Sequence, residues 1–198
     1  MKSLLPLTLA ALLLGGPAAR AEEFLDQLDL VRELYEEGDI GGAMTELEFA
    51  RQMLQERLDE RFAAVFPEPP EGWRAGEVQR QSGAMFGGGT FLERSYSEAA
   101  GNARIEARII AGSPMIQAFA AMMASPAMIA SEPGARRVRI GRTNAVLTWD
   151  ETTRSGELRF LVGGAMIQLE GSDLTDGDVL LALAKRFDLR AVEELTGG

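Results

Sequence analysis

Apolar residues recur at helical spacing in the N-terminal part of the chain. Between residues 22 and 37 they follow at steps of four, three and four, which places these side chains on one side of a helix: Phe24, Leu28, Val31 and Tyr35. The same periodicity predicts a second helix from about residue 42 to residue 65, with these residues on its buried side: Leu47, Leu54, Leu58, Phe62 and Val65. Gly38 ends the first helix and Asp39 can cap the second, so residues 22–66 are predicted to form an antiparallel helical hairpin.

A proline-rich segment, "PEPPEGW" at residues 67–73, follows the hairpin. Proline cannot continue a helix, and the residue before it avoids the helical conformation, so we predict a linker here. Trp73 closes the segment. Its ring is expected to anchor the linker to the core, and the alternative is an aromatic side chain that stacks on a ligand.

Beyond residue 73 apolar and polar residues alternate, which is the pattern of half-solvated antiparallel strands. In "ARIEARII" the inward positions are Ala103, Ile105, Ala107 and Ile109. The alternation continues over residues 137–140, 144–150, 157–162 and 166–170, and its clearest inward positions are Leu158, Phe160, Val162, Ile167 and Leu169. Turns such as Gly163-Gly164 connect these strands.

Two helical segments interrupt and close this sheet. The first, residues 113–132, begins with Ser113 as N-cap and Pro114 at the first helical position. The second, residues 175–195, begins with a capping box of Thr175 and Asp178, and its buried side holds Val179, Leu180, Leu183, Ala184 and Phe187. Residues 74–198 are therefore predicted to form a sheet domain, and the fold class is α+β: an N-terminal helical hairpin followed by an antiparallel β-sheet with covering helices.

The stretch "GAMFGGGTF" is the segment that most resembles a ligand-binding loop. Gly83 and Gly88 have the spacing of a phosphate-binding loop, but Gly89 stands where that loop needs its lysine. A dinucleotide fingerprint fails because Leu92 stands at its third glycine position and a strand follows. We predict that residues 87–89 form a turn or bulge between two strands.

The chain contains neither cysteine nor histidine. Disulfides, the usual zinc sites, haem ligation, cysteine nucleophiles and Ser-His-Asp triads are therefore excluded. Asp173, Asp176 and Asp178 cluster, but their spacing does not fit a calcium loop, and we expect them to favour a helix N-terminus. We expect no catalytic residue, metal or cofactor, and a hydrolase that uses two carboxylates remains an alternative.

The first residues have the features of a secretory signal peptide. An apolar run from Leu4 to Leu14 follows Lys2, and Ala19 and Ala21 provide the small side chains of a cleavage site, so we expect residues 1–21 to be removed after Ala21. The run is too short to span a bilayer, so no stable membrane anchor is expected. Cleavage would leave 18 basic and 30 acidic residues, a net charge of 18 − 30 = −12, which argues against nucleic acid or anionic lipid as partners.

A methionine-rich helix is the candidate partner surface. Methionine gives soft, adaptable apolar surface, and the residues concerned are Met115, Phe119, Met122, Met123 and Met128, with Trp73 as a further candidate. Met115, Phe119 and Met122 form one stripe that we expect to cover the sheet, whereas Met123 and Met128 lie off that stripe. A partly exposed patch for a protein partner or a lipid is therefore predicted.

Three resemblances extend this interpretation. "LYEEGDIGGAMTELEFARQML" resembles the turn of a tetratricopeptide unit, but Pro69 stands where a second unit would begin, so we expect a plain hairpin, with a peptide-binding groove as the alternative. The order "PEPPEGW", "GGGT", "SPM" and "RIG" resembles a group of uncharacterised exported proteins of Gram-negative bacteria. The order of strands and helices after residue 72 looks like the Mog1/PsbP-like sandwich, which occurs in binding and accessory modules.

These expectations favour a non-enzymatic binding or accessory module in the periplasm. Its partner would be a protein of the cell envelope, contacted through the methionine-rich helix. A carrier of a lipid or another small apolar ligand is the second hypothesis, and a small carboxylate-pair hydrolase is the third.

Overall fold

The computed structural model describes residues 17–81 and 89–197, with side chains from residue 22 onward. The chain divides into two compact units, Met1–Leu54 and Gln55–Gly198. We call their described parts the hairpin unit and the sheet unit, and each is considered by itself. Most of the predicted signal peptide, and Gly83, Gly87 and Gly88 of the glycine-rich stretch, lie outside the described residues.

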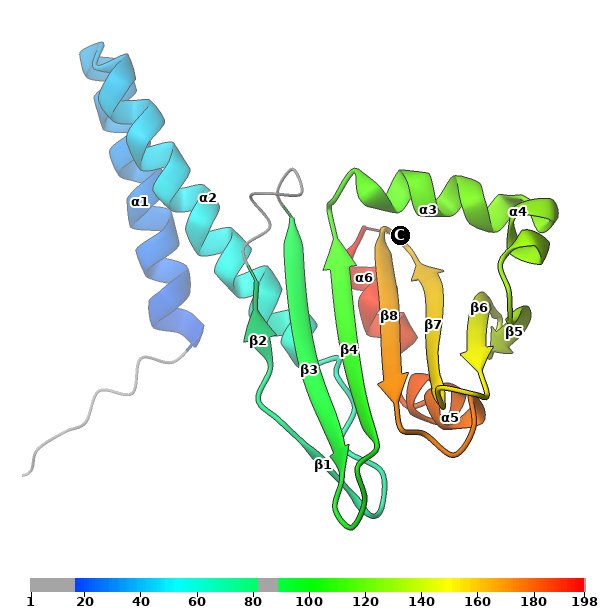
Figure 1. The fold of residues 1–198 in the computed structure, drawn as a ribbon. Coiled ribbons are helices and arrows are strands. Elements are labelled where there is room, and N and C mark those ends of the chain that lie inside the picture. Colours follow the sequence, from blue (N-terminus) through cyan, green and yellow to red (C-terminus); the bar gives the residue numbers. More distant parts are fainter. Residues whose placement is uncertain (1–16, 82–88, 198) are drawn as a thin grey trace, which may run out of the picture. The chain divides into compact units, whose positions relative to one another are not determined.

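The fold class predicted from the sequence, α+β, is confirmed (Figure 1). The helices are α1 (Pro17–Glu37), α2 (Ile40–Ala63), α3 (Met115–Ala124), α4 (Pro126–Ser131), α5 (Asp178–Ala184) and α6 (Leu189–Leu195). The strands are β1 (Trp73–Ala75), β2 (Gln79–Arg80), β3 (Thr90–Glu98), β4 (Arg104–Ala111), β5 (Ala135–Ile140), β6 (Thr143–Asp150), β7 (Ser155–Val162) and β8 (Ala165–Ser172). None of the helices in the described residues is both long and apolar enough to cross a membrane.

The turn of the hairpin forms as its sequence predicts. Gly38 has a φ of 86°, and the N–H of Asp39 donates to the carbonyl of Leu34 at 2.9 Å, which closes the end of α1. The Asp39 carboxylate then accepts from the N–H of Gly42 at 2.9 Å and caps the start of α2. The two helices therefore run antiparallel within the hairpin unit.

The strands form one antiparallel sheet in the order β1-β3-β4-β8-β7-β6-β5, and β2 pairs with Leu92 and Glu93 near the start of β3. Because side chains alternate along each strand, one face collects the apolar positions. The inward positions predicted on β4, β7 and β8 are confirmed, since all of them are at most 6% exposed: Ala103, Ile105, Ala107, Ile109, Leu158, Phe160, Val162, Ile167 and Leu169.

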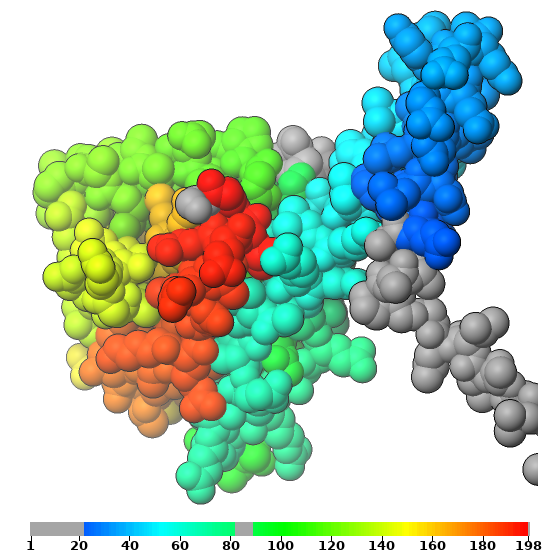
Figure 2. All heavy atoms as spheres, turned by 180° about the vertical axis from the view of Figure 1, so that it is seen from behind, coloured from blue at the N-terminus to red at the C-terminus, as the bar shows by residue number. Residues whose placement is uncertain are grey.

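Helices α5 and α6 cover this apolar face (Figure 2). The last turns of α2, from residue 55 onward, belong to the same core and contribute Phe62, while Phe66 follows them and packs its ring 5.9 Å from that of Phe187. Leu180 and Val192 of α5 and α6 are fully buried there. We call this the inner face of the sheet.

Helices α3 and α4 lie over one end of the opposite, outer face. The sequence predicted one helix over residues 113–132, and this prediction is wrong in part, because the helix breaks at Ser125. Ser125 precedes Pro126 and takes an extended conformation, with φ −101° and ψ 104°, as the residue before a proline prefers. The predicted helix start is one residue too early, because α3 begins at Met115 and its N-cap residue is Pro114, although the hydroxyl of Ser113 accepts from the N–H of Met115 at 3.3 Å.

The C-terminal segment also divides into two helices. The predicted capping box is wrong, because α5 begins at Asp178 and its N-cap residue is Gly177, so Thr175 lies outside the helix. The carboxylate of Asp176 instead accepts from the N–H of Asp178 at 2.8 Å. Asp188 starts α6 by accepting from the N–H of Ala191 at 3.1 Å.

Candidate functional site

The two helices of the hairpin unit meet along a seam of alternating three- and four-residue steps. The least exposed residues of α1 are Phe24, Gln27, Val31 and Leu34, and those of α2 within this unit are Ala43, Glu46, Ala50 and Met53. Gln27 donates to the side chain of Glu46 at 2.6 Å and to its main-chain carbonyl at 3.2 Å. This spacing is that of the a and d positions of a coiled coil.

A second apolar stripe follows the seam on each helix by one position. It consists of Leu25, Leu28 and Tyr35 on α1 and of Ile40, Met44, Leu47 and Leu54 on α2, and these seven residues are called the hairpin face. In an antiparallel pair of helices, two seam residues that face each other are each followed by a residue on the same flank of the pair. Gln27 and Glu46 face each other in this way, so Leu28 and Leu47, which follow them, lie on the same flank. The two stripes therefore form one continuous surface.

Side chains of the hairpin face are exposed to an unusual degree for their type. The exposed fractions are 69% for Met44, 66% for Tyr35 and 59% for Leu25, and Leu28, with 37%, is the least exposed. Leu30 and Phe49 are exposed on the opposite flank. Exposed apolar patches of this kind are typical of interaction sites.

The prediction that Leu47 and Leu54 lie on the buried side of α2 is wrong, and the predicted stripe of α1 divides, because Leu28 and Tyr35 are exposed. Each helix carries two adjoining apolar stripes with steps of three and four residues, so periodicity alone does not show which stripe is buried. Only one of the two stripes can face the partner helix. The small side chains of Ala43 and Ala50 let the helices approach closely and therefore occupy the seam. The larger residues on the adjoining stripe remain outside it.

Acidic side chains border the hairpin face on α1. Glu22, Asp29 and Glu36 recur every seven residues on the side of the stripe that points away from the seam, and all are exposed. Each of the two apolar stripes is interrupted at one position, by Arg32 on α1 and by Arg51 on α2.

Both of these arginines are engaged by a carboxylate of their own helix. Arg32 lies 3.0 Å from Asp29, and Arg51 lies 2.7 Å from Glu48. Hydrogen bonding to Arg51 lowers the pKa of Glu48. Arg32 therefore offsets part of the negative charge of the border at Asp29, whereas Arg51 pairs with Glu48, which lies outside the border of α1.

The methionine-rich helices provide a smaller exposed surface. Met115 and Met128 are 46% and 53% exposed, whereas Met122 and Met123 are half-buried against the apolar cluster between α3 and the outer face. Phe119, expected within the partner surface, is only 8% exposed, because it packs with Ile116 on Ile110 and Met166. The buried stripe of α3 therefore starts at Ile116 and not at Met115.

Trp73 is half-buried against the core of the sheet unit. It begins β1 and pairs with Glu98 of β3. A second contact of this segment comes from Tyr96, whose hydroxyl donates to the carbonyl of Pro67 at 2.8 Å. Burial raises the pKa of Tyr96 to about 12.

A charged network crosses the uncovered part of the outer face. Arg108 lies within 2.8 Å of Glu93, Glu106 and Glu170, and although burial opposes its charge, hydrogen bonds to Glu93 and Glu170 raise its pKa. Gln168 donates at 2.7 Å to both Glu170 and Glu157 and so links two facing strands.

The network continues across β7 to the end of α4. Arg159 contacts Glu157 at 3.2 Å and Glu132 at 2.9 Å. Burial raises the pKa of Glu157, although the positive charge of Arg159 acts to lower it. Because arginine and glutamine donors occupy these carboxylates, the arrangement serves to hold four strands in register.

A pocket of about 360 Å³ lies at one end of the inner face. Apolar side chains of Leu58, Phe62 and Leu195 line it together with Gln55, Gly89, Thr90 and Thr196 and the main chain at 111–112 and 164. Behind it, the buried carboxylate of Asp59 accepts from the Thr90 hydroxyl at 2.7 Å and from Gln55 at 2.9 Å. Arg80 forms an ion pair with the second oxygen of Asp59 at 2.7 Å.

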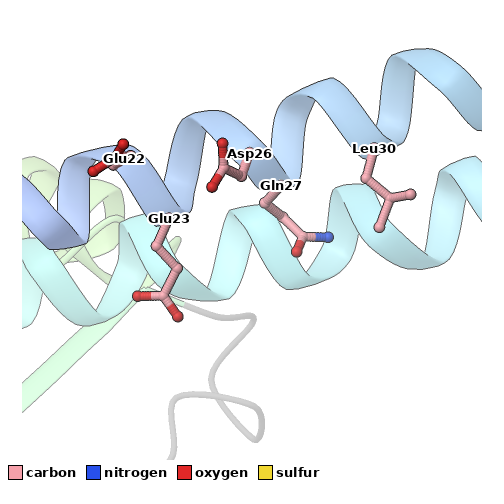
Figure 3. A pocket seen from close by; sticks show the side chains of 5 residues that line it. All are labelled: Glu22, Glu23, Asp26, Gln27 and Leu30. Carbon is pink, nitrogen blue, oxygen red and sulfur yellow. The ribbon is translucent and has the colours of Figure 1, made fainter.

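An acidic pocket of about 420 Å³ lies on α1 and is lined by Glu22, Glu23, Asp26, Gln27 and Leu30 (Figure 3). Its three carboxylates are exposed and hence solvated, whereas a general acid of a glycosidase needs burial to raise its pKa. Among the described residues, no three acidic side chains are placed to hold one metal ion.

Comparison of the chain with protein-family models, with curated proteins and with solved structures finds no match. The geometry of the hairpin face, the α3–α4 surface and the pocket therefore carries the functional argument. Of these, the hairpin face was missed at the level of sequence. The signal that could reveal it is the pair of adjoining apolar stripes on each helix, of which the outer one is interrupted once on each helix, by Arg32 and by Arg51.

Proposed function

We propose that the protein is a non-enzymatic binding module of the cell envelope that recognises a protein partner through its hairpin face. The observation that carries this proposal is the distribution of exposed large apolar side chains. Among the described residues, nine of them lie in the hairpin unit and two, Met115 and Met128, lie in the sheet unit. Covering one such side chain yields about 1.5–3 kcal/mol when burial is complete, so a partner that covers several of them gains substantial affinity.

Export to the envelope is supported by the signal-peptide features of the first 21 residues and by the resemblance to exported proteins of Gram-negative bacteria. A binding function is supported by the lack of histidine and cysteine, which removes the commonest nucleophiles and general bases. The carboxylate-pair hydrolase is less favoured, because the carboxylates of the acidic pocket on α1 are solvated and those of the outer face accept from arginine and glutamine donors.

The proposal is tested by formaldehyde crosslinking in intact cells of the source organism, followed by recovery of tagged protein under denaturing conditions. The face variant Leu25→Ser/Tyr35→Ser/Leu47→Ser should lose the crosslinked partner. The matched control Leu30→Ser/Phe49→Ser removes apolar side chains from the opposite flank and should retain it.

A third variant, Met115→Ser/Met128→Ser, separates the two exposed surfaces. Serine at these two exposed positions disturbs the sheet unit less than changes at the half-buried Met122 and Met123. Loss of the partner in this variant alone would move the binding surface from the hairpin to α3–α4. Retention of the partner in all three variants would refute the proposal.

A carrier of a small apolar ligand is the second candidate, because the pocket beside Thr90 combines three apolar side chains with a few polar groups. Its volume of about 360 Å³ fits a small ligand. Native mass spectrometry of the purified protein should then show a copurifying mass that Phe62→Ala reduces. An unliganded mass under gentle conditions would favour the protein-binding function.

A further inference from the structure

We infer that the occupant of the hairpin face is a cationic amphipathic helix of the protein partner. This inference rests on the proposed function and specifies the chemistry of the partner. The apolar face predicts the shape of the occupant, since a pair of helices with an uncovered stripe accepts a third helix whose own apolar residues recur every three or four positions.

The negative charge around the hairpin face favours a partner helix with positive charge. Residues 22–54 carry ten acidic side chains against Arg32 and Arg51, a net charge of −8. Glu22, Asp29 and Glu36 form a border at seven-residue spacing along the stripe of α1. A helix with lysine or arginine at the same spacing would place one cation opposite each carboxylate, and at Asp29 its cation would share the carboxylate with Arg32.

A second copy of this chain is a poorer occupant for the same reason. Two hairpin faces brought together would place two units of −8 side by side, and their borders would repel. Within residues 22–54 the cations are Arg32 and Arg51, and these are already paired at 3.0 and 2.7 Å with Asp29 and Glu48.

Binding of a defined probe to the purified protein tests the inference. The probe is a fluorescein-labelled peptide of about 18 residues, long enough to cover the exposed stripe as a helix, with leucine at three- and four-residue steps and lysine on the rest of its surface. A second peptide carries glutamate in place of each lysine. We expect the lysine peptide to bind at least tenfold more tightly, and its affinity to fall several-fold between 0.05 and 0.3 M salt, roughly the range over which exposed charges become screened.

Three variants locate the binding. The face variant Leu25→Ser/Tyr35→Ser/Leu47→Ser should lose at least tenfold in affinity while far-ultraviolet circular dichroism shows unchanged helix content. The border variant Glu22→Gln/Asp29→Asn/Glu36→Gln should lose several-fold and show a weaker salt dependence. The control Glu23→Gln/Glu33→Gln/Glu37→Gln removes the same number of charges from the other side of α1 and should lose less than twofold.

Equal affinities for the two peptides, or equal losses in the border and control variants, would overturn the inference. So would a dimer in sedimentation equilibrium that the face variant dissociates, since the occupant would then be a second copy. If crosslinking in cells depends on the hairpin face while the lysine peptide shows no preference, the proposed function stands and only the partner class falls. If crosslinking does not depend on the face, the proposed function itself falls.

Discussion

The buried carboxylate of Asp59 gives a prediction that can be worked through from its contacts. Asp59 is 6% exposed and Thr90 is 2% exposed, and their side chains are 2.7 Å apart. Gln55 also donates to this carboxylate, at 2.9 Å, and Arg80 pairs with it from a half-exposed position. The cluster therefore fastens the last turns of α2 to β2 and β3 within the sheet unit.

Replacing Asp59 by alanine removes two hydrogen bonds to a charged acceptor, each of which contributes about 1.5–3 kcal/mol. Two effects reduce the loss, because the cost of burying the carboxylate disappears and Gln55 remains 2.9 Å from the Thr90 hydroxyl. We expect the free energy of unfolding to fall by about 2–3 kcal/mol. Arg80→Gln should cost less than about 1 kcal/mol, because the Arg80 side chain is half-exposed and solvent screens its ion pair.

Urea unfolding followed by tryptophan fluorescence measures this change. Both tryptophans, Trp73 and Trp149, belong to the sheet unit, so the signal reports on the unit that contains Asp59. A double-mutant cycle with Thr90→Val should give a coupling energy of at least about 1 kcal/mol. An Asp59→Ala loss below about 0.5 kcal/mol, or strictly additive effects with Thr90→Val, would refute the reasoning.

Three further predictions concern single residues of the sheet unit. Gly89→Ala should destabilise by at least about 2 kcal/mol in the same assay, because Gly89 has a φ of 100° and an added Cβ would clash with the carbonyl of Ala111. In an alkaline titration followed by ultraviolet absorbance, Tyr96→Phe should abolish the step with a pKa of about 12, and a remaining step there would contradict the assignment. Burial raises the pKa of Glu157, so its protonated form favours the folded state and its contribution to stability is lost as pH rises above the ordinary value of 4.5. The stability of Glu157→Gln relative to the parent should therefore increase between pH 4 and pH 7. A decrease in the relative stability of the variant over this range would contradict the sign of the pKa shift.

The sheet unit could be predicted from the sequence to a large extent. Alternation of side chains has a period of two, and a shift by one residue would expose Ile105, Ile109, Leu158 and Phe160 together, so the pattern determines the faces strongly. The pattern does not show where a helix divides. Ser125 before Pro126 gives a local reason for one break, but the break before α6 is marked only by Asp188, which caps the new helix.

The hairpin unit was predicted as a pair of helices, but its exposed surface was not. Adjoining apolar stripes on α1 fit the seam almost equally well at the level of periodicity. The choice depends on the partner helix, where Ala43 and Ala50 permit close approach and Gln27 bonds to Glu46. Contacts between distant residues of this kind are not encoded in the spacing along one helix.

The cluster around Asp59 could not be predicted for a similar reason. Gln55, Asp59, Arg80 and Thr90 come from three elements, and none of them forms a motif with its neighbours in sequence. The sequence contains thirty acidic residues, and only the fold selects the one that is buried with a threonine.

The central claim is that the hairpin face contacts a protein partner, and a photo-crosslinking amino acid placed around α2 tests it most directly. We predict partner adducts in intact cells from positions Met44, Leu47 and Leu54, and no adducts from Phe49 or Gln52, so that reactivity recurs with the spacing of the exposed stripe. Adducts of equal yield at all five positions, or none at any of them, would contradict the claim.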